Sequence, residues 1–247
     1  MVNVRGNMKD KISNTQASYD QVAVEYAKKF KDEMDDKPFD RDCLDRLSRE
    51  VGTLGPICDL GCGPGQIARY LHRQGADTLG VDLSPRMIAE AQRLNPDIPF
   101  HQGDMLSLPD ADESWGVIAA FYCIIHIPRE RVVDALREMK RVLKPGGVLL
   151  VTFHIGEEIK HLDEWWEKPV NVDFAFYQPE EMEKWLMEAG FELEETLVRE
   201  PNPDVEVATR RAYLFARKPR QKLNQFRQLF RKLEADVIEK ERARSGK

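Results

Sequence analysis

The pattern of hydrophobic and polar positions divides the chain into a helical beginning and a longer stretch of alternating strands and helices. Within residues 15–36, apolar side chains recur at roughly helical spacing: Ala17, Val22, Val24, Tyr26, Ala27 and Phe30. We expect a helix there and a second one over 39–50, because Pro38 breaks the segment.

From residue 57 onward, short apolar runs alternate with amphipathic segments. The runs predict strands over 57–60, 78–81, 98–101, 115–123 and 147–154. The segments between them predict helices over 66–74, 85–94 and 129–143. Strands that alternate with helices are typical of a mainly parallel sheet covered by helices on both faces, so we predict an α/β fold.

This alternation ends after residue 154. Residues 155–178 have no clean period and are rich in aromatic side chains: Trp165, Trp166, Phe174, Phe176 and Tyr177. An insertion at the end of a central strand is where open α/β sheets place ligands, so we expect it to line a site, although the aromatic residues could equally be packing. A helix over 179–189 and two strands over 191–198 and 205–216, joined by a Pro-Asn-Pro-Asp turn, complete the predicted sheet.

Composition narrows the class of protein. The chain has 247 residues, of which 42% are hydrophobic and 32% charged, as expected for one α/β domain with a tail. Its longest apolar run, Val117 to Ile125, spans nine residues, against about 20 for a membrane-spanning helix. Four cysteines without a C-x-x-C pair, and opening residues without an apolar signal core, lead us to expect a reducing cytoplasm and no membrane.

The net charge of −6 conceals two parts of opposite sign. Residues 217–247 hold 11 Lys and Arg against 4 Asp and Glu, a net of +7, which leaves −13 for residues 1–216. Apolar residues in this tail fall at spacings of 3, 4, 3 and 4 and predict a helix: Leu223, Phe226, Phe230, Leu233 and Val237. We expect this basic helix to dock on the acidic body, within one chain or across a homodimer.

The strongest motif follows the first predicted strand and reads Asp59-Leu60-Gly61-Cys62-Gly63-Pro64-Gly65. Glycines allow a sharp turn and close approach of a ligand, and the next helix offers unpaired N–H groups. A plain strand-to-helix turn is the alternative. The residue at the sixth position is Gln66, where the dinucleotide fingerprint has glycine, which argues against NAD or FAD.

Two further carboxylates follow the next two strands. Asp82 can accept hydrogen bonds from both hydroxyls of a ribose, or serve as a charge at a helix N-terminus. Asp104, within Gly103-Asp104-Met105, can read an amino group beside an apolar side chain that stacks on a base, or be an ordinary turn residue.

Together these segments resemble the class I S-adenosylmethionine-dependent methyltransferases, over about residues 17–217. The turn 141–147 is similar to the family's R-x-L-K-P-G-G element, and 18–27 resembles the N-terminal lid of its small-molecule branch. One departure is Trp115-Gly116, where the family often has Phe-Asp.

The resemblance implies a three-layer Rossmann-like fold with a seven-stranded sheet whose last strand is antiparallel. It divides the chain into a helical lid (1–50), an α/β domain (51–216, with the acceptor-site insertion 155–178) and a tail (217–247). It implies S-adenosylmethionine as cofactor, with contacts from Tyr19, Tyr26, Asp59, Gly61, Cys62, Gly63, Gly65, Asp82, Leu83, Met87, Gly103, Asp104, Met105 and Phe121. In this arrangement Asp59 and Phe121 would lie near the methionine amino group, and Tyr19 and Tyr26 would close over the cofactor.

The expected reaction is in-line transfer of a methyl group to an O, N or C atom of a small molecule. A protonated acceptor such as a hydroxyl needs a base, and His126 and His154 follow strand ends where a neutral imidazole could supply one; His161 lies in the insertion. All three could instead be structural. Their spacing matches no standard ligand motif, so we expect no metal.

Three other functions compete with this one. An NAD-dependent oxidoreductase is opposed by Gln66 and the Asp104-Met105 pair. A nucleic-acid methyltransferase could use the basic tail, but the sequence has no base-flipping Asn/Asp-Pro-Pro-Tyr/Phe element and the body at −13 would repel a polyanion. A regulatory protein that binds the cofactor without catalysis stays open.

Overall fold

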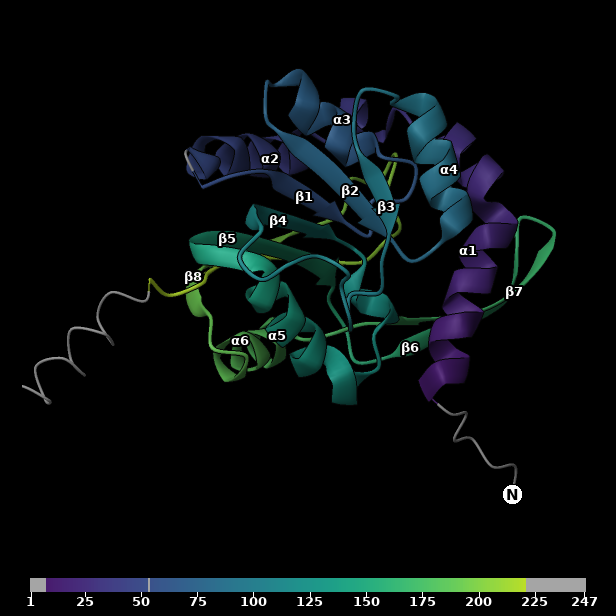
Figure 1. Cartoon of the computed structure of the whole chain (residues 1–247). Coiled ribbons are helices and arrows are strands. Elements are labelled where there is room, and N and C mark those ends of the chain that lie inside the picture. Colours follow the sequence, from purple (N-terminus) through teal and green to yellow (C-terminus); the bar gives the residue numbers. More distant parts are fainter. Residues whose placement is uncertain (1–7, 53, 221–247) are drawn as a thin grey trace, which may run out of the picture.

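The computed structural model describes residues 8–52 and 54–220, and a seven-stranded sheet forms its centre (Figure 1). The strands lie in the order β3-β2-β1-β4-β5-β9-β8. β9 pairs antiparallel with both neighbours, while the other pairs in this sheet are parallel, which confirms a mainly parallel sheet with an antiparallel last strand. The strands are β1 (Ile57–Leu60), β2 (Thr78–Asp82), β3 (Phe100–Gln102), β4 (Trp115–Phe121), β5 (Leu143–His154), β8 (Glu192–Arg199) and β9 (Arg211–Arg217).

Helices cover both faces of this sheet and produce the predicted three layers (Figure 1). On one side lie α2 (Pro38–Val51), α3 (Gln66–Arg73) and α4 (Pro85–Leu94), and on the other α5 (Val132–Val142) and α6 (Pro179–Glu188). β4 is buried throughout, and its alternate side chains enter different clusters: Ile118 packs with α5 and α6, and Val117 with α2 and α3. A continuous apolar run therefore marks a strand covered on both faces.

Several element boundaries differ from the predicted ones. β5 begins at Leu143 rather than at residue 147, because Leu143 pairs with Trp115 across a register shift. Residues 200–210 connect β8 to β9, a longer link than the tight turn expected from the Pro-Asn-Pro-Asp sequence. Pro38 occupies the first turn of α2, where its missing N–H costs no helical hydrogen bond.

The aromatic insertion forms a hairpin that the hydrophobic pattern did not predict. β6 (Ile159–Trp165) pairs antiparallel with β7 (Lys168–Ala175) in a separate two-stranded sheet. The two residues between them, Trp166 and Glu167, have φ of 52° and 61°. Such turns normally carry Asn-Gly, so Trp-Glu at this position gives no sequence signal for a hairpin.

The long helix α1 (Met8–Phe30) lies beside this hairpin and beside α4 (Figure 1). Val22 and Ala23 of α1 pack with Met87 of α4 and with the two adjacent tryptophans of the hairpin. The Ser84 hydroxyl donates to Asp20 at 2.5 Å, and Lys168 Nζ donates to Glu25 at 2.7 Å. The first contact holds α1 to the start of α4, and the second holds it to the hairpin.

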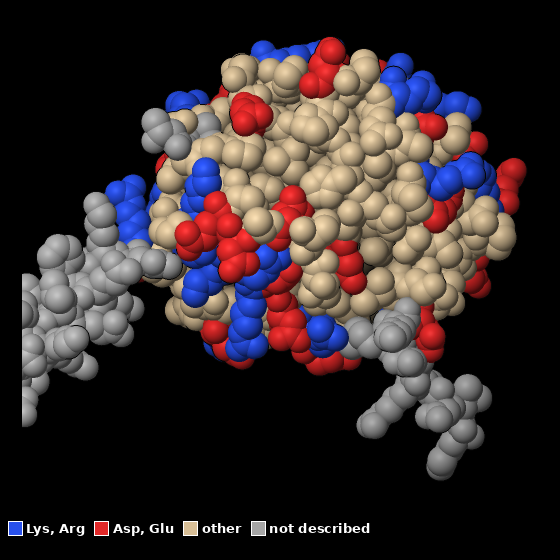
Figure 2. Space-filling model, viewed as in Figure 1, with Lys and Arg blue, Asp and Glu red and all other residues tan. Residues whose placement is uncertain are grey.

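The surface in Figure 2 carries acidic and basic side chains in mixed groups, and neither sign forms a large patch on the face shown. Over residues 8–52 and 54–220, no helix is long and apolar enough to cross a membrane. The predicted tail helix falls on residues 221–247 and lies outside the described residues.

Candidate active site

A cavity lies beneath α1, at the edge of the sheet where the parallel strands end. It encloses about 1090 Å³ of space, part of it open to solvent. Its walls include the glycine turn after β1, Asp82 after β2, Asp104 after β3 and His126 after β4. This edge is where open α/β sheets bind ligands.

The glycine turn between β1 and α3 depends on backbone conformations that favour glycine. Gly61, Gly63 and Gly65 all have positive φ, at 71°, 51° and 83°. A Cβ on Gly61 would lie 2.3 Å from the Cβ of Cys123, so β1 and the β4 loop can approach only because Gly61 has no side chain. Gly61, Cys62 and Gly63 line the cavity, which leaves their backbone next to any ligand there.

Asp82 lies in the cavity wall and is held by two backbone donors. The Gly63 N–H donates to its Oδ2 and the Ser84 N–H to its Oδ1, each at 2.8 Å. Burial raises the pKa of Asp82 to about 6, and the two N–H groups act against that rise. Near pH 7 the group is therefore a carboxylate with oriented oxygens.

Asp59 takes a different position from the other predicted carboxylates. It is 1% exposed, does not line the cavity, and accepts a hydrogen bond from the Ala68 N–H at 2.9 Å. Burial raises the pKa of Asp59 to about 7. The carboxylate thus fixes the start of α3 against β1, while its predicted closeness to the cofactor stays a prediction.

The wall near β3 contains the other predicted base-binding residues. Asp104 Oδ1 accepts from the Leu106 N–H at 2.9 Å, and both Asp104 and Met105 line the cavity. Leu83 lines it as well. Met87 is fully buried in the α1–α4 contact and does not line it. Gly103 and Phe121 complete the predicted residues found in the wall, and Gly65 lies outside it.

Two tyrosines of α1 close the cavity from above. Tyr19 and Tyr26 line it and have their rings 6.1 Å apart, and Trp165 of the hairpin lies within 6 Å of each ring. The Tyr19 hydroxyl lies 2.7 Å from Nε2 of His126. Burial raises the pKa of both tyrosines, so their hydroxyls are protonated and Tyr19 donates to the imidazole.

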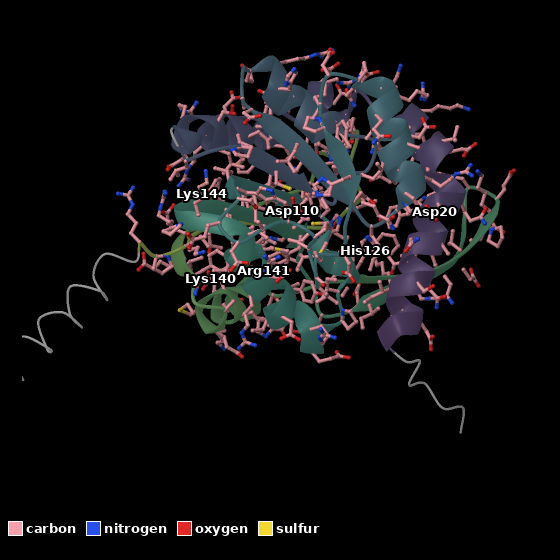
Figure 3. All side chains as sticks on the ribbon, viewed as in Figure 1. Asp20, Asp110, His126, Lys140, Arg141 and Lys144 are labelled. Atoms are coloured by element: carbon pink, nitrogen blue, oxygen red, sulfur yellow. The ribbon has the colours of Figure 1, made fainter. Side chains whose placement is uncertain are left out.

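His126 lies between the strand ends and α1 (Figure 3). Its Nδ1 lies 2.9 Å from the Asp173 carbonyl oxygen, which accepts only if Nδ1 carries the proton. Nε2 is then the acceptor for Tyr19. Burial lowers the pKa of His126 to about 4, so the ring is neutral near pH 7.

The other two histidines lie outside the cavity wall. His154 contacts the Thr209 hydroxyl at 2.8 Å, stacks on Phe176 and reaches the cavity only through the ring of Tyr122, 5.0 Å away. Burial lowers the pKa of His154 to about 4. His161 is exposed on β6 and contacts Asp173 at 2.8 Å.

Several cavity residues were missed in the sequence. Glu33 and Lys37 come from the connection between α1 and α2, Asp40 lies in the first turn of α2, Gln66 begins α3, and Tyr122 follows β4 with a φ of 51°.

No group of three or more His, Cys, Asp or Glu within residues 8–52 and 54–220 is arranged to hold a metal ion.

The sheet order, the antiparallel last strand and the acidic residues after β2 and β3 define a class I methyltransferase fold. Residues 57–147 match a family described as a methyltransferase domain. The matched segment runs from β1 into the beginning of β5 and contains the glycine turn, Asp82 and Asp104.

Known proteins resemble the chain over parts of its length. A malonyl-[acyl-carrier protein] O-methyltransferase of Enterobacter lignolyticus is 35% identical over 121 residues, 46% of each chain. A demethylmenaquinone methyltransferase of Chlorobaculum parvum is 38% identical over 92 residues, 37% of each chain. The chain thus spans less than half the length of each of these curated relatives.

Among solved structures, the fold resembles the Burkholderia thailandensis 1,6-didemethyltoxoflavin-N1-methyltransferase, with a TM-score of 0.66 and 18% identity. That similarity covers 89% of this chain and 93% of the other. At this identity the likeness concerns the fold alone.

Proposed function

We propose that this protein transfers a methyl group from S-adenosylmethionine to an O, N or C atom of a small molecule. The observation that carries the proposal is the continuity of the cavity, which joins the glycine turn and the carboxylates after β2 and β3 to a second polar region near Lys37 and Asp40. One cavity can therefore hold a cofactor and an acceptor together. The names of the curated relatives support a small acceptor or one carried by a protein.

The residues at the first region fit this cofactor. A ribose has two neighbouring hydroxyls, and Asp82 offers two oxygens whose orientation is fixed by the Gly63 and Ser84 N–H groups. A methionine portion needs backbone close by, and a Cβ built on Gly63 would meet Tyr26 Cε1 at 3.8 Å, an ordinary contact distance, so a small group fits between this turn and Tyr26. Asp104 and Met105 would bind the adenine as an acceptor and an apolar neighbour.

The cofactor supplies a methyl group on a positively charged sulfur, which is already reactive toward nucleophiles. The protein must then hold the nucleophile in line with that group and exclude water. Orientation of this kind contributes about 7–11 kcal/mol in well-aligned reactions. Tyr19, Tyr26 and Trp165 close over the cavity and would supply the exclusion of water.

A hydroxyl acceptor must also lose a proton. We assign that proton to His126, whose Nε2 carries a lone pair because Nδ1–H donates to Asp173. The Tyr19 hydroxyl lies 2.7 Å from Nε2, between the imidazole and the acceptor in the proposed transfer. The acceptor's proton would therefore pass to Tyr19 Oη, while Tyr19 gives its own hydroxyl proton to Nε2 of His126. The Asp173 carbonyl would stabilise the imidazolium that forms.

We further propose that the protein works in the cytoplasm and does not bind nucleic acid. All four cysteines are free and buried, as in a reducing compartment. The net charge of −13 over residues 1–216 would repel a polyanion. The division into lid, α/β domain and docking tail, with a homodimer formed through the tail, stays a prediction.

The experiment is titration calorimetry of the full chain with S-adenosylhomocysteine and, separately, with NADH. Binding of the first alone supports the proposal, and binding of NADH alone contradicts it. Incubation of pooled small metabolites with methyl-labelled cofactor then identifies the acceptor. A chain that binds the cofactor but labels no metabolite, nucleic acid or carrier protein would instead be a regulatory protein.

A further inference from the structure

The cavity extends across the sheet, well beyond the region expected to bind the cofactor. Asp104 follows β3, at one edge of the seven-stranded sheet, whereas Asp40 bonds to Tyr213 of β9, near the other edge. Both residues line the same cavity. The polar region around Asp40 is therefore the natural place for the methyl acceptor, and an inference about it rests on the proposed function.

Asp40 lines this region, and one of its carboxylate oxygens has no hydrogen-bond partner among the described residues. Its side chain is 1% exposed, and Tyr213 and Arg199 both donate to Oδ1, at 2.5 and 3.2 Å. Oδ2 is buried and has no hydrogen-bond partner among the described residues. Lys37 Nζ approaches Oδ2 only to 4.0 Å, which is too far for a hydrogen bond.

Gln66, the first residue of α3, also has a buried side-chain oxygen without a hydrogen-bond partner among the described residues. It is 9% exposed, and its amide nitrogen donates to Glu33 at 3.2 Å. That contact directs Oε1 away from Glu33, and Oε1 is likewise buried without a hydrogen-bond partner among the described residues. Buried hydrogen-bond acceptors without a donor are rare in folded proteins, so each of these two oxygens is a candidate to accept a hydrogen bond from a ligand.

The ammonium group of Lys37, which lines the same region, is already paired with carboxylates of the protein. Lys37 Nζ lies 2.5 Å from Glu33 and 4.0 Å from both Asp40 and Glu206. Three carboxylates therefore surround one ammonium group, and none of its charge is left for a carboxylate or phosphate on a ligand. An anion placed here would also meet the bare oxygen of Asp40.

We propose that this region binds the methyl acceptor through at least two hydrogen-bond donors of the acceptor, O–H or N–H, which pair with Asp40 Oδ2 and Gln66 Oε1. The acceptor is thus a neutral or cationic molecule with at least two O–H or N–H donors, and its donor-bearing part is not an acid. Phe121 and Tyr122, which line the same cavity, give the bound molecule flat apolar walls.

Matched small aromatic probes test this with the full chain saturated with S-adenosylhomocysteine. Catechol is compared with 1,2-dimethoxybenzene, aniline with N,N-dimethylaniline, and benzoate serves as the anion, with affinities from saturation-transfer NMR. We expect each donor-bearing probe to bind at least tenfold more tightly than its methylated partner, and benzoate to bind least. Equal affinity within the pairs, a preference for benzoate, or binding by none of the probes would overturn the inference.

Two variants test whether Asp40 and Gln66 cause the preference for donor-bearing probes. Asp40→Asn keeps an oxygen for Tyr213 and Arg199 but turns an N–H toward the cavity, and Gln66→Met removes the acceptor while keeping the side chain's length. Either variant should reduce the preference for catechol at least fivefold, while the exposed controls Asp36→Asn and Gln74→Met should not change it. If Asp40→Asn does not fold, Gln66→Met decides: an unchanged preference there refutes the pairing.

These outcomes separate the two proposals. A chain that does not bind S-adenosylhomocysteine refutes the proposed function whatever the probes do. A chain that binds it but shows no preference for donors refutes only the assignment of the acceptor.

Discussion

Asp82 is the residue on which the cofactor assignment depends most directly, and Asp82→Asn tests it with the smallest change in shape. In the wild-type chain each carboxylate oxygen of Asp82 accepts one backbone N–H at 2.8 Å, and Asp82 lines the cavity. Asparagine has one oxygen, so its amide nitrogen must face either the Gly63 N–H or the Ser84 N–H. One turn hydrogen bond and one ribose hydrogen bond are lost together.

The expected loss follows from these two contacts. Charge-assisted hydrogen bonds contribute about 1.5–3 kcal/mol each, so loss of one to the ribose should weaken S-adenosylhomocysteine binding roughly 10- to 100-fold. Loss of the turn hydrogen bond should lower the free energy of unfolding by about 1–2 kcal/mol. Burial raises the pKa of Asp82 to about 6, so wild-type affinity should also fall as the pH drops through 6 and the carboxylate takes up a proton. The variant has no such carboxylate and should lack that part of the pH dependence.

Calorimetric titration at pH 8 and pH 5 measures both effects, and urea unfolding measures the stability. Asp77→Asn is the matched control, because Asp77 is an exposed residue just before β2, at the end of the strand remote from Asp82. An Asp82→Asn protein that is folded and binds S-adenosylhomocysteine within threefold of the wild type would refute the ribose assignment.

Three other substitutions test the site and the fold. With a hydroxyl acceptor, His126→Ala should lower kcat at least tenfold in a methyl-transfer assay and leave the affinity for S-adenosylhomocysteine within threefold. An unchanged kcat would contradict the proposal that His126 acts as the base. Burial lowers the pKa of His154 from 6.5 to about 4, so the unfolded chain binds more protons than the folded chain between these pH values, and the free energy of unfolding falls as the pH drops. His154→Asn removes this titration and should make the slope of the free energy of unfolding against pH shallower by up to about 1.4 kcal/mol per pH unit. Urea unfolding at pH 4.5 to 6.5 measures the slope. Gly61→Ala should lower the urea midpoint of unfolding much more than Gly75→Ala. Both glycines have positive φ, but only the first substitution places a Cβ 2.3 Å from the Cβ of Cys123. Equal losses would show that backbone strain alone matters.

The sheet and the part of the cavity next to β1, β2 and β3 were predictable because their signals are local. Strands such as β4 are continuous apolar runs, the glycine turn follows β1 directly, and Asp82 is the last residue of β2. In a parallel sheet, consecutive strand ends meet at one edge, so local position in the sequence was enough to bring these residues together.

The polar part of the cavity around Lys37 and Asp40 was not predictable, because it depends on contacts between distant parts of the chain. Asp40 meets Tyr213 across 173 positions, and no local pattern indicates that pairing. The hairpin was missed for another reason: its turn uses Trp166 and Glu167 with positive φ, which only tertiary contacts can stabilise. Its tip rests on α1, where Trp166 meets Tyr26 and Phe30 at about 6.2 Å.

That aromatic cover also has an optical consequence. Tyr19 and Tyr26 lie 5.6 and 5.9 Å from Trp165, close enough for excited tyrosines to pass their energy to the indole rather than emit. Any separation of α1 from the hairpin lengthens these distances and changes the balance of the two emissions. The ratio of the two emissions therefore reports the distance between α1 and the hairpin, and rapid-mixing fluorescence can follow it without a label.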